Sequence, residues 1–472
     1  MDGLRVSKDG TMRLQAGALC VALTPSNLDE VFSADLSGAD CIEIRLDYLK
    51  NPRESVLVRW DKLPIPVIAT CRRKELGGQF NGTIQEEIKI LQYAVENGAQ
   101  LVDIDYRFAQ SMAGADVIAS FHDFAGTPPE LDSLMDQICA SPGQIAKIAT
   151  MINSWSDNRR LLGLLSRRWP KPVIVAGMGD LGQMTRVTGP SRGSFLSYAG
   201  LAANASAPGQ LTVQDMNHVY QFRRANRTTK LIGIVGYPVG HSLSPNIHNR
   251  AFQKENLDFI YLKFPTPDVK DFFDNARELG IAGFSVTIPH KTAVIPFLDE
   301  VSSAAREIGA VNTVTLREGK WIGDNTDVYG VEAALASVGF DPSNKTVVIL
   351  GGGGASKAAV AALKSAKKVE VLSRRDIPNA SNFACDLLIN ATPIGMFPMV
   401  DMTPVTGPIP GNVVFDMVYN PPVTRLLRSA TDQGKTVIQG TTMFLAQAAR
   451  QFEIWTGHRA PPEIFEEKLI LT

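Results

Sequence analysis

The sequence predicts an α/β protein in two parts: a (β/α)8 barrel, and then a two-lobed unit that ends in an open sheet. In the first half of the 472-residue chain, short apolar runs alternate with amphipathic stretches. A polar, basic segment, Arg223–Lys230, then interrupts the apolar periodicity. Further on, the apolar run Val347–Leu350 leads into Gly351–Gly354 and an alanine-rich helix, Ser356–Lys364.

Composition narrows the class of protein. Hydrophobic residues make up 44% of the chain and charged residues 20%, which is typical of a globular protein. The net charge of −1 gives no field for nucleic acid, and no apolar run approaches the roughly 20 residues of a membrane span. The 5 scattered cysteines favour reduced thiols over disulfides or a zinc site, so we expect no metal. Without an N-terminal signal core we expect a cytoplasmic protein, the alternative being an organellar protein whose targeting peptide was removed.

The first half contains the runs expected to form the barrel. Apolar, β-branched runs lie at Leu19–Leu23, Cys41–Leu46, Pro66–Cys71, Leu101–Ile104, Val117–Ser120, Ile145–Thr150, Val173–Ala176 and Phe195–Ser197. Helical stripes lie between some of them, at Gln85–Asn97, Leu131–Cys139 and Asn158–Trp169. The same alternation also allows an open doubly wound sheet, but eight strands favour a closed TIM barrel.

A barrel carries its chemistry at the carboxyl ends of its strands. Lys147 is an outlier in the apolar run IAKIA, and burial there would lower its pKa and make it a nucleophile towards a carbonyl. A lone strand lysine would ordinarily be a surface residue, but His122 at the end of the preceding strand favours an active site. Glu43, Arg45 and Asp47 alternate on one face of the second strand, which would be costly in a core without a function.

Other polar residues follow the remaining strands. Arg72 and Glu75 come after the third strand. Arg186, on a loop after the seventh strand, could hold a carboxylate through two hydrogen bonds. Ser206 and Gln210, in a loop of small residues, could bind hydroxyl groups.

At this point a resemblance becomes specific. Leu19–Val219 resembles the type I 3-dehydroquinate dehydratases through the motifs EIRLD, TCRR…GG, FHD, AKIA, GxxGxxTR and SAPGQ. The resemblance implies that Lys147 forms a Schiff base with the substrate ketone and that His122 is the general base and acid. It also implies that Arg186 holds the substrate carboxylate. The residues implied to hold the ring oxygens are Glu43, Arg45, Arg72, Ser206 and Gln210.

One position departs from that family. The family places a glutamate directly before the Gly-Gly pair, where it orients the histidine, whereas this chain has Leu76 there and Glu75 one residue earlier. Either the loop shifts so that Glu75 takes that role, or the orienting contact is lost. We expect the shift.

The second half begins with a segment suited to a substrate. Strands are expected at Leu231–Gly236, Phe259–Phe264 and Gly283–Ile288, and helices at Asn246–Glu255 and Pro267–Leu279. Ser242 and Ser244 precede the first of these helices, where hydroxyls and backbone N–H groups suit a carboxylate. The alternative is ordinary N-capping by one of the serines. Lys291 and Asp327 would form a proton-transfer pair, although either alone would read as a surface lysine or a turn aspartate.

The glycine run predicts a dinucleotide site. Glycines allow a tight turn and a close approach of backbone amides to a pyrophosphate at a helix N-terminus. The second strand, Val369–Leu372, is followed by Ser373, Arg374 and Arg375, and arginine there suits the 2′-phosphate of NADP. The alternative for the two arginines is a solvated turn. The helix Met443–Trp455 has an apolar stripe typical of a core, with Gln447 as a polar exception.

Residues 231–471 resemble the shikimate dehydrogenases through VGYPVGHSLSPNIHNRAF, GFSVTIPHK, GAVNT, GDNTD, NATPIGM and DMVYNPPVT. The resemblance implies that Lys291 and Asp327 move the proton while hydride passes between shikimate and nicotinamide. It implies a Rossmann-like NADP domain, in which Gly352 stands where alanine is more usual. The implied substrate residues are Ser242, Ser244, Thr287, Asn312, Asp327, Tyr419 and Gln447. The implied cofactor residues are Gly351, Gly352, Gly353, Gly354, Ala355, Ser373, Arg374, Arg375, Asn390, Thr392 and, near the nicotinamide, Met443.

Together the halves resemble the bifunctional dehydroquinate dehydratase–shikimate dehydrogenases, in which the product of the first reaction is the substrate of the second. We expect a barrel at residues 12–222, a linker at 223–230, a substrate domain at 231–329, an NADP domain at 330–438 and returning helices at 439–472. One alternative is a metabolite sensor without turnover; it is disfavoured by the presence of Lys147, His122, Lys291 and Asp327. The other is an NAD-dependent quinate dehydrogenase; it is disfavoured by Ser242, Arg374 and Arg375. A further hypothesis is that the linker raises the substrate concentration at the second site; an equal lag for fused and separated domains would contradict it.

Overall fold

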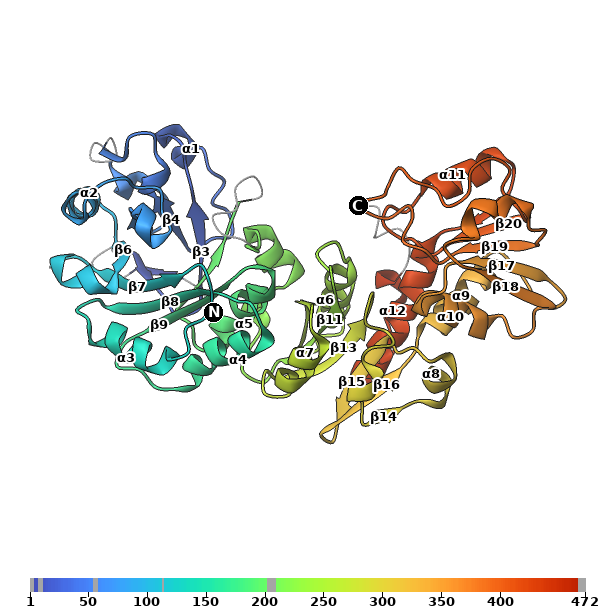
Figure 1. The fold of residues 1–472 in the computed structure, drawn as a ribbon. Coiled ribbons are helices and arrows are strands. Elements are labelled where there is room, and N and C mark those ends of the chain that lie inside the picture. Colours follow the sequence, from blue (N-terminus) through green and yellow to red (C-terminus); the bar gives the residue numbers. More distant parts are fainter. Residues whose placement is uncertain (1–3, 7–11, 54–57, 113, 202–208, 466–472) are drawn as a thin grey trace. The chain divides into compact units, whose positions relative to one another are not determined.

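The computed structural model describes residues 4–6, 12–53, 58–112, 114–201 and 209–465. It divides into two compact units (Figure 1). The first unit consists of Met1–Lys230 and Asp258–Gly280, and the second of Leu231–Leu257 and Ile281–Thr472.

The first unit is built on an 8-stranded sheet in the order β10-β3-β4-β5-β6-β7-β8-β9. Every strand pairs in parallel with its neighbour in this order. Because β10, the last of these strands in the sequence, pairs with β3, the first, the sheet curls into a nearly closed barrel. The eight predicted strands and the barrel are confirmed. Their bounds are β3 (Ala18–Leu23), β4 (Cys41–Arg45), β5 (Val67–Thr70), β6 (Leu101–Asp105), β7 (Val117–Asp123), β8 (Ile145–Met151), β9 (Val173–Met178) and β10 (Leu196–Ala199).

Helices surround the barrel strands (Figure 1). They are α1 (Leu28–Phe32), α2 (Ile84–Glu96), α3 (Leu131–Ala140), α4 (Trp155–Gly163) and α5 (Gln183–Arg192). Capping residues set two of their starts: Thr83 forms a capping box with Glu86 at α2, and Ser154 forms one with Asp157 at α4. Inside the barrel an apolar layer closes the end away from the strands' carboxyl ends, so polar side chains gather at the other end.

The first unit also contains β12 (Phe259–Pro265), which packs on α5, and α7 (Val269–Ala276), which packs on α4. The fully buried ring of Trp155 meets Phe264 and Phe272 edge-on, with ring centroids 5.6 and 5.1 Å away. The expected linker is held to the same unit, because Arg223 pairs with Asp40 at 2.7 Å. Residues 223–230 are thus fixed by polar contacts and do not form a free tether.

The second unit has two sheets. Strands β11 (Lys230–Gly236), β13 (Ile281–Val286), β15 (Thr313–Arg317), β16 (Lys320–Asp324) and β14 (Glu300–Val301) follow one another in that order in the first sheet. Strand β15 runs antiparallel to both its neighbours. The second unit also contains α6 (Ser244–Lys254) and α8 (Ser303–Ile308), and α9 (Asp327–Ser337), which packs against the helices of the other sheet.

The other sheet is the open parallel sheet predicted for the nucleotide, in the order β18-β17-β19-β20-β21. Alternate residues of its central strands face two apolar clusters, with Val347 and Ile349 in one and Val348 and Leu350 in the other, so both faces are covered. The bounds are β17 (Thr346–Leu350), β18 (Lys368–Leu372), β19 (Leu387–Asn390), β20 (Val413–Asp416), β21 (Thr436–Ile438), α10 (Gly354–Ala362), α11 (Arg425–Asp432) and α12 (Gly440–Thr456).

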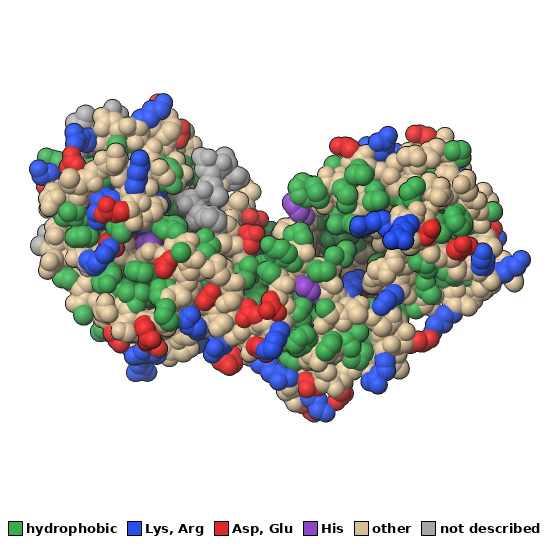
Figure 2. Space-filling model, in the orientation of Figure 1, with side chains coloured by type: hydrophobic (Ala, Val, Ile, Leu, Met, Phe, Trp, Pro, Cys, Tyr) green, Lys and Arg blue, Asp and Glu red, His purple; other side chains and the backbone are tan. Residues whose placement is uncertain are grey.

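The surface agrees with the near-zero net charge. On the face shown in Figure 2, Lys and Arg side chains are interspersed with Asp and Glu. Within the described ranges, no helix is both long enough and apolar enough to cross a lipid bilayer.

Candidate active sites

Lys147 lies in the middle of β8 and is buried, as predicted. Its Nζ donates to Asp103 Oδ2 at 2.8 Å and lies 3.6 Å from Glu43 Oε2. Two carboxylates thus lie within ion-pairing distance of the amine, which burial of a lone lysine did not predict. The amine is therefore held by ion pairs inside the barrel.

Asp103 is the centre of this network and was not among the residues predicted from the sequence. Its Oδ1 accepts hydrogen bonds from Arg72 Nη2 at 2.8 Å and from Ser120 Oγ at 2.7 Å. Burial raises the pKa of Asp103, but the nearby cations of Lys147 and Arg72 lower it by more, so the group stays ionised. An aspartate within the apolar run LVDID is as unusual as a lysine within IAKIA, and that signal could have found it.

His122 ends β7 beside the lysine. Strand register pairs Ser120 with Lys147, so His122, two residues further on, points to the same face of the sheet. Burial, and then the cations of Arg72 and Lys147, hold the pKa of His122 well below its usual range. A neutral imidazole can accept a proton at neutral pH. His122 lines a small cavity whose other walls come from Arg72, Leu76, Glu87, Asp103, Ile104, Asp105 and Ser120.

The expectation for Glu75 is wrong. Its side chain is 67% exposed and pairs with Arg73, because Lys74–Leu76 form a 3₁₀ turn that directs it outwards. Leu76 lines the cavity of His122 in its place. A different glutamate, Glu87 of α2, reaches this cavity; it accepts a hydrogen bond from Arg73 Nε at 2.7 Å, and burial raises its pKa to about 7.

Two further barrel residues lie differently from expectation. Asp47 belongs to a 3₁₀ turn and not to the strand, and Arg45 binds it through two hydrogen bonds of 2.9 and 2.8 Å. Arg186 lies on α5 and not on a loop, where its Nε donates to the Gly177 carbonyl at 3.0 Å and burial lowers its pKa to about 10. Ser206 lies outside the described residues, and Gln210 is half-buried.

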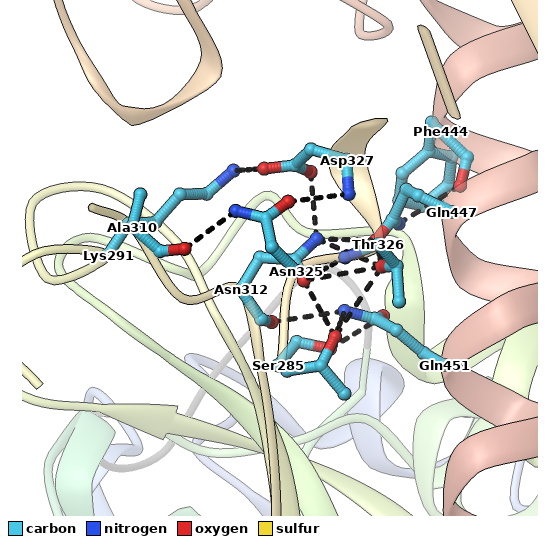
Figure 3. Close-up of polar contacts among 11 residues, drawn as sticks. Ser285, Lys291, Ala310, Asn312, Asn325, Thr326, Asp327, Phe444, Gln447 and Gln451 are labelled. Carbon is cyan, nitrogen blue, oxygen red and sulfur yellow. Dashed lines mark hydrogen bonds and ion pairs between the residues drawn. The ribbon is translucent and has the colours of Figure 1, made fainter. Parts of the chain in front are cut away.

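The second unit brings Lys291 and Asp327 together as predicted (Figure 3). Lys291 Nζ, in the turn after β13, donates to Asp327 Oδ2 at 2.5 Å. Asp327 is the first residue of α9, so it benefits from the positive end of the helix dipole. Asn312 Nδ2 donates to its other oxygen at 2.8 Å and lies 3.4 Å from Gln447 Oε1.

Three supporting residues of this site escaped the sequence argument (Figure 3). Thr326 accepts from Asn312 Nδ2 at 3.0 Å. Gln451 Nε2 donates to the Asn312 carbonyl at 3.1 Å, and Ser285 Oγ donates to Gln451 Oε1 at 2.9 Å. Gln451 is four residues after Gln447 and shares its helix face, so this spacing was an available signal.

The N-cap residue of α6 is Leu243, without a side-chain cap, so the expected N-capping by a serine is wrong. Ser242 and Ser244 are buried, and Ser242 Oγ accepts from the Ser244 N–H at 3.3 Å at the start of α6. The Tyr419 ring stacks on Phe444 with centroids 4.1 Å apart, and burial raises the pKa of its hydroxyl. Thr287 is half-buried directly after β13.

The glycine loop fits a dinucleotide. Gly351 has φ +99°, and a Cβ there would lie 2.9 Å from Thr392 Cγ2, so glycine is required. Gly352 and Gly353 face open space. A Cβ at Gly354 would lie 3.0 Å from Lys291 Cδ, which places the loop beside the proton-transfer pair. Helix α10 starts without a side-chain cap, so its first N–H groups can bind a phosphate.

The remaining cofactor candidates differ in exposure. Arg374 and Arg375 are exposed, Ser373 Oγ donates to Asp376 at 2.5 Å, and Ala355 is half-buried at the start of α10. Asn390 is fully buried and donates to Asp416 Oδ1 at 2.9 Å, so it shapes the loop after β19. Met443 packs in the apolar cluster behind β17. In the part of the chain that the structure describes, no group of three or more His, Cys, Asp or Glu side chains is placed to hold a metal.

Comparisons with known proteins agree with both sites. Residues 19–227 match the model of type I 3-dehydroquinase, residues 234–314 that of the shikimate dehydrogenase substrate-binding domain, and residues 440–470 that of the shikimate 5′-dehydrogenase C-terminal domain. The chain is 38% identical to the shikimate dehydrogenase (NADP(+)) of Alkaliphilus metalliredigens, over 52% of this chain and 97% of that protein.

Two relatives extend over both halves. The pentafunctional AROM polypeptide of Yarrowia lipolytica is 30% identical over 92% of this chain, which spans 31% of that protein. The chloroplastic bifunctional 3-dehydroquinate dehydratase/shikimate dehydrogenase of Arabidopsis thaliana is 36% identical over 95% of this chain and 83% of that protein. Together with the two sites, this similarity shows that the chain belongs to the bifunctional 3-dehydroquinate dehydratase/shikimate dehydrogenase enzymes of the shikimate pathway.

Proposed function

We propose that Lys147 attacks the ketone of 3-dehydroquinate and forms a Schiff base. His122 then removes the C2 proton and delivers it to the departing hydroxyl, so that water leaves. One further water molecule, equal to the one lost when the Schiff base formed, hydrolyses the iminium, which breaks the N–C bond, releases 3-dehydroshikimate and restores the Lys147 amine. The iminium withdraws electrons from the carbon acid, which makes this proton accessible to a base. The observation that carries the proposal is the placement of Lys147 and a neutral His122 on one face of neighbouring strands.

The cations and carboxylates around this pair would bind the rest of the substrate. Arg186 would hold the substrate carboxylate, and Glu43, Arg45 and Arg72 the ring oxygens, with Ser206 and Gln210 from the last loop. Glu43 and Arg72 already touch the Lys147–Asp103 network, so they are placed to adjust the lysine as substrate enters.

We also propose that Asp327 and Lys291 transfer the proton to and from the shikimate hydroxyl. Asn312 fixes the second oxygen of Asp327, which keeps the carboxylate directed at Lys291. Gln447, Thr287, Ser242, Ser244 and Tyr419 would hold the substrate's other oxygens and its carboxylate. The carrying observation is the 2.5 Å contact of Lys291 with Asp327 beside the glycine loop.

NADP(H) is the proposed cofactor, and it supplies or accepts the hydride when bound. The backbone N–H groups at Gly351–Gly354 and Ala355 would hold its pyrophosphate. Arg374 and Arg375, exposed after β18, with Ser373 would bind the 2′-phosphate, which argues against an NAD-dependent quinate dehydrogenase. Asn390 and Thr392 would shape the loop nearest the cofactor, and Met443 would lie behind the nicotinamide.

The functional boundaries are proposed as well. They are a dehydratase at residues 12–222, a connecting segment at 223–230, a substrate domain at 231–329, an NADP domain at 330–438 and a C-terminal segment at 439–472. We place the protein in the cytoplasm, because its 5 cysteines are all free thiols, as in a reducing compartment.

The test is covalent trapping. Borohydride added with 3-dehydroquinate should reduce the Schiff base, and peptide mass mapping should find the adduct on Lys147. A trapped adduct on another lysine, or none, would contradict the dehydratase assignment. Initial rates with NADPH and NADH test the cofactor, and equal rates would contradict the role of Arg374 and Arg375.

A further inference from the structure

Tyr198 lies against the Lys147 amine. It belongs to β10, is 7% exposed and is not part of any motif in the sequence argument. Lys147 Nζ donates to the Tyr198 hydroxyl at 3.1 Å and lies 4.2 Å from the centre of its ring. The same nitrogen therefore has an ion pair with Asp103, a hydrogen bond to a phenol and an aromatic face beneath it.

Schiff-base formation changes how many hydrogen bonds the Lys147 nitrogen can donate. The Lys147 ammonium first gives one proton to a neighbouring base, and the free amine then attacks the carbonyl carbon, so that an N–C bond forms. The carbonyl oxygen leaves as water with that proton and a second hydrogen of the nitrogen, and the iminium keeps one hydrogen and the positive charge. The nitrogen then has one hydrogen to donate in place of three, so its hydrogen bonds to Asp103 and the Tyr198 hydroxyl cannot both persist. A ring face attracts a cation whatever its number of hydrogens.

We propose that Tyr198 is a positioning residue for Lys147: its hydroxyl fixes the amine before reaction, and its ring stabilises the cation before and after the Schiff base forms. The ring is well suited to this because the site is buried, where cation–π attraction is strongest. The inference rests on the proposed role of Lys147 and adds a residue to that site.

Two substitutions separate the hydroxyl from the ring. Tyr198→Phe keeps the ring and removes the hydrogen bond, and Tyr198→Leu removes both. We expect borohydride trapping of the 3-dehydroquinate adduct to slow by about 3- to 10-fold in the Phe variant. In the Leu variant it should slow by about a further 10-fold. In both variants kcat should fall while KM stays unchanged. Tyr220→Phe is the matched control, since Tyr220 is a buried phenol of the same unit away from Lys147.

Each result has a distinct meaning. Stepwise slowing on Lys147, with the Tyr220 variant unchanged, supports the inference. Unchanged trapping rates in both Tyr198 variants overturn it and leave the role of Lys147 intact. An adduct that is absent, or on another lysine, in the unmodified enzyme overturns the proposed function itself. If the Leu variant does not fold, as judged by its circular dichroism, the Phe variant and its pH–rate profile decide: a rate and profile equal to those of the unmodified enzyme overturn the inference.

Discussion

The two active sites of the chain each hold a lysine–aspartate pair, yet they enclose it differently. The Lys147 side chain is 5% exposed, lies in mid-strand and meets two carboxylates and a phenol. The Lys291 side chain is 15% exposed, lies in a turn and meets one carboxylate. Full enclosure suits an amine that becomes covalently attached, whereas a pair at a loop suits a proton that must reach a substrate and return. In the proposed functions, the same two residue types would therefore serve different chemistry according to their enclosure.

The largest expected effects come from replacing one or the other of these two lysines with alanine. Lys147→Ala should lower dehydratase kcat by more than about 10⁴-fold and leave the dehydrogenase rate unchanged, since it removes the nucleophile. Lys291→Ala should do the reverse, lowering the dehydrogenase rate by about 10²- to 10⁴-fold. Separate assays with 3-dehydroquinate and with shikimate measure each. The controls are Lys171→Ala and Lys320→Ala, both outside the two networks. Loss of both activities in either site variant would contradict the division.

A packing change should affect stability without reaching either site. Trp155→Ala should destabilise the first unit by about 3–5 kcal/mol, because it empties the contact with Phe264 and Phe272. Trp155→Phe keeps an aromatic ring and removes the buried ring N–H, which has no hydrogen-bond partner among the described residues, so the loss of stability should be smaller. Scanning calorimetry gives both melting temperatures. Equal values for the two variants would show that the ring contacts contribute little.

Glu87 lines the cavity of His122 whereas Glu75 points outwards, so the two glutamates should differ in their effect on dehydratase kcat. Glu87→Gln should lower dehydratase kcat by about 3- to 10-fold, since it weakens the buried contact with Arg73 beside His122. Glu75→Ala should change it by less than about twofold, because an exposed ion pair contributes little. Steady-state kinetics measure both. A Glu75 variant as damaged as the Glu87 variant would show that Glu75 turns towards His122 when substrate is bound.

The smallest expected effect is a pH dependence in the second unit. Burial raises the pKa of Asp416 to about 6 from an ordinary value of 3.8. Its folded pKa is the higher one, so the native state binds the extra proton, and this contribution to stability is present below pH 3.8 and is lost as pH rises through about 6. Asp416→Asn lacks this titration. Its free energy of unfolding, relative to that of the unmodified enzyme, should therefore rise by about 1 kcal/mol when the pH is raised from about 5 to about 7.5. Melting temperatures at the two pH values test the sign. A variant whose melting temperature falls relative to that of the unmodified enzyme as the pH rises would contradict the prediction.

The sequence predicted the fold well because the fold depends on local patterns. The eight barrel strands, the glycine turn and the helix carrying Gln447 all follow from apolar runs and their punctuation, and the structure confirms them. Lys147 and His122 were found because polar residues are costly at the ends and interiors of buried strands. Asp103 carries the same signal and was passed over.

What could not be predicted depends on contacts between distant residues. The direction of Glu75 is set by a 3₁₀ turn and by Arg73, and no spacing in the sequence indicates it. Glu87 reaches the cavity of His122 only because α2 packs against the barrel there. The attachment of residues 258–280 to the barrel unit depends on Trp155 meeting Phe264, more than 100 residues away along the chain.

The central claim is that two sites on one chain act in sequence, and one assay tests it directly. The protein is incubated with 3-dehydroquinate and NADPH while the absorbance of the enone product and the loss of NADPH are followed together. We predict NADPH consumption that requires 3-dehydroquinate, is preceded by a transient enone and is abolished by Lys147→Ala until 3-dehydroshikimate is added. Enone that accumulates without NADPH loss, or NADPH loss that Lys147→Ala does not affect, would contradict the claim.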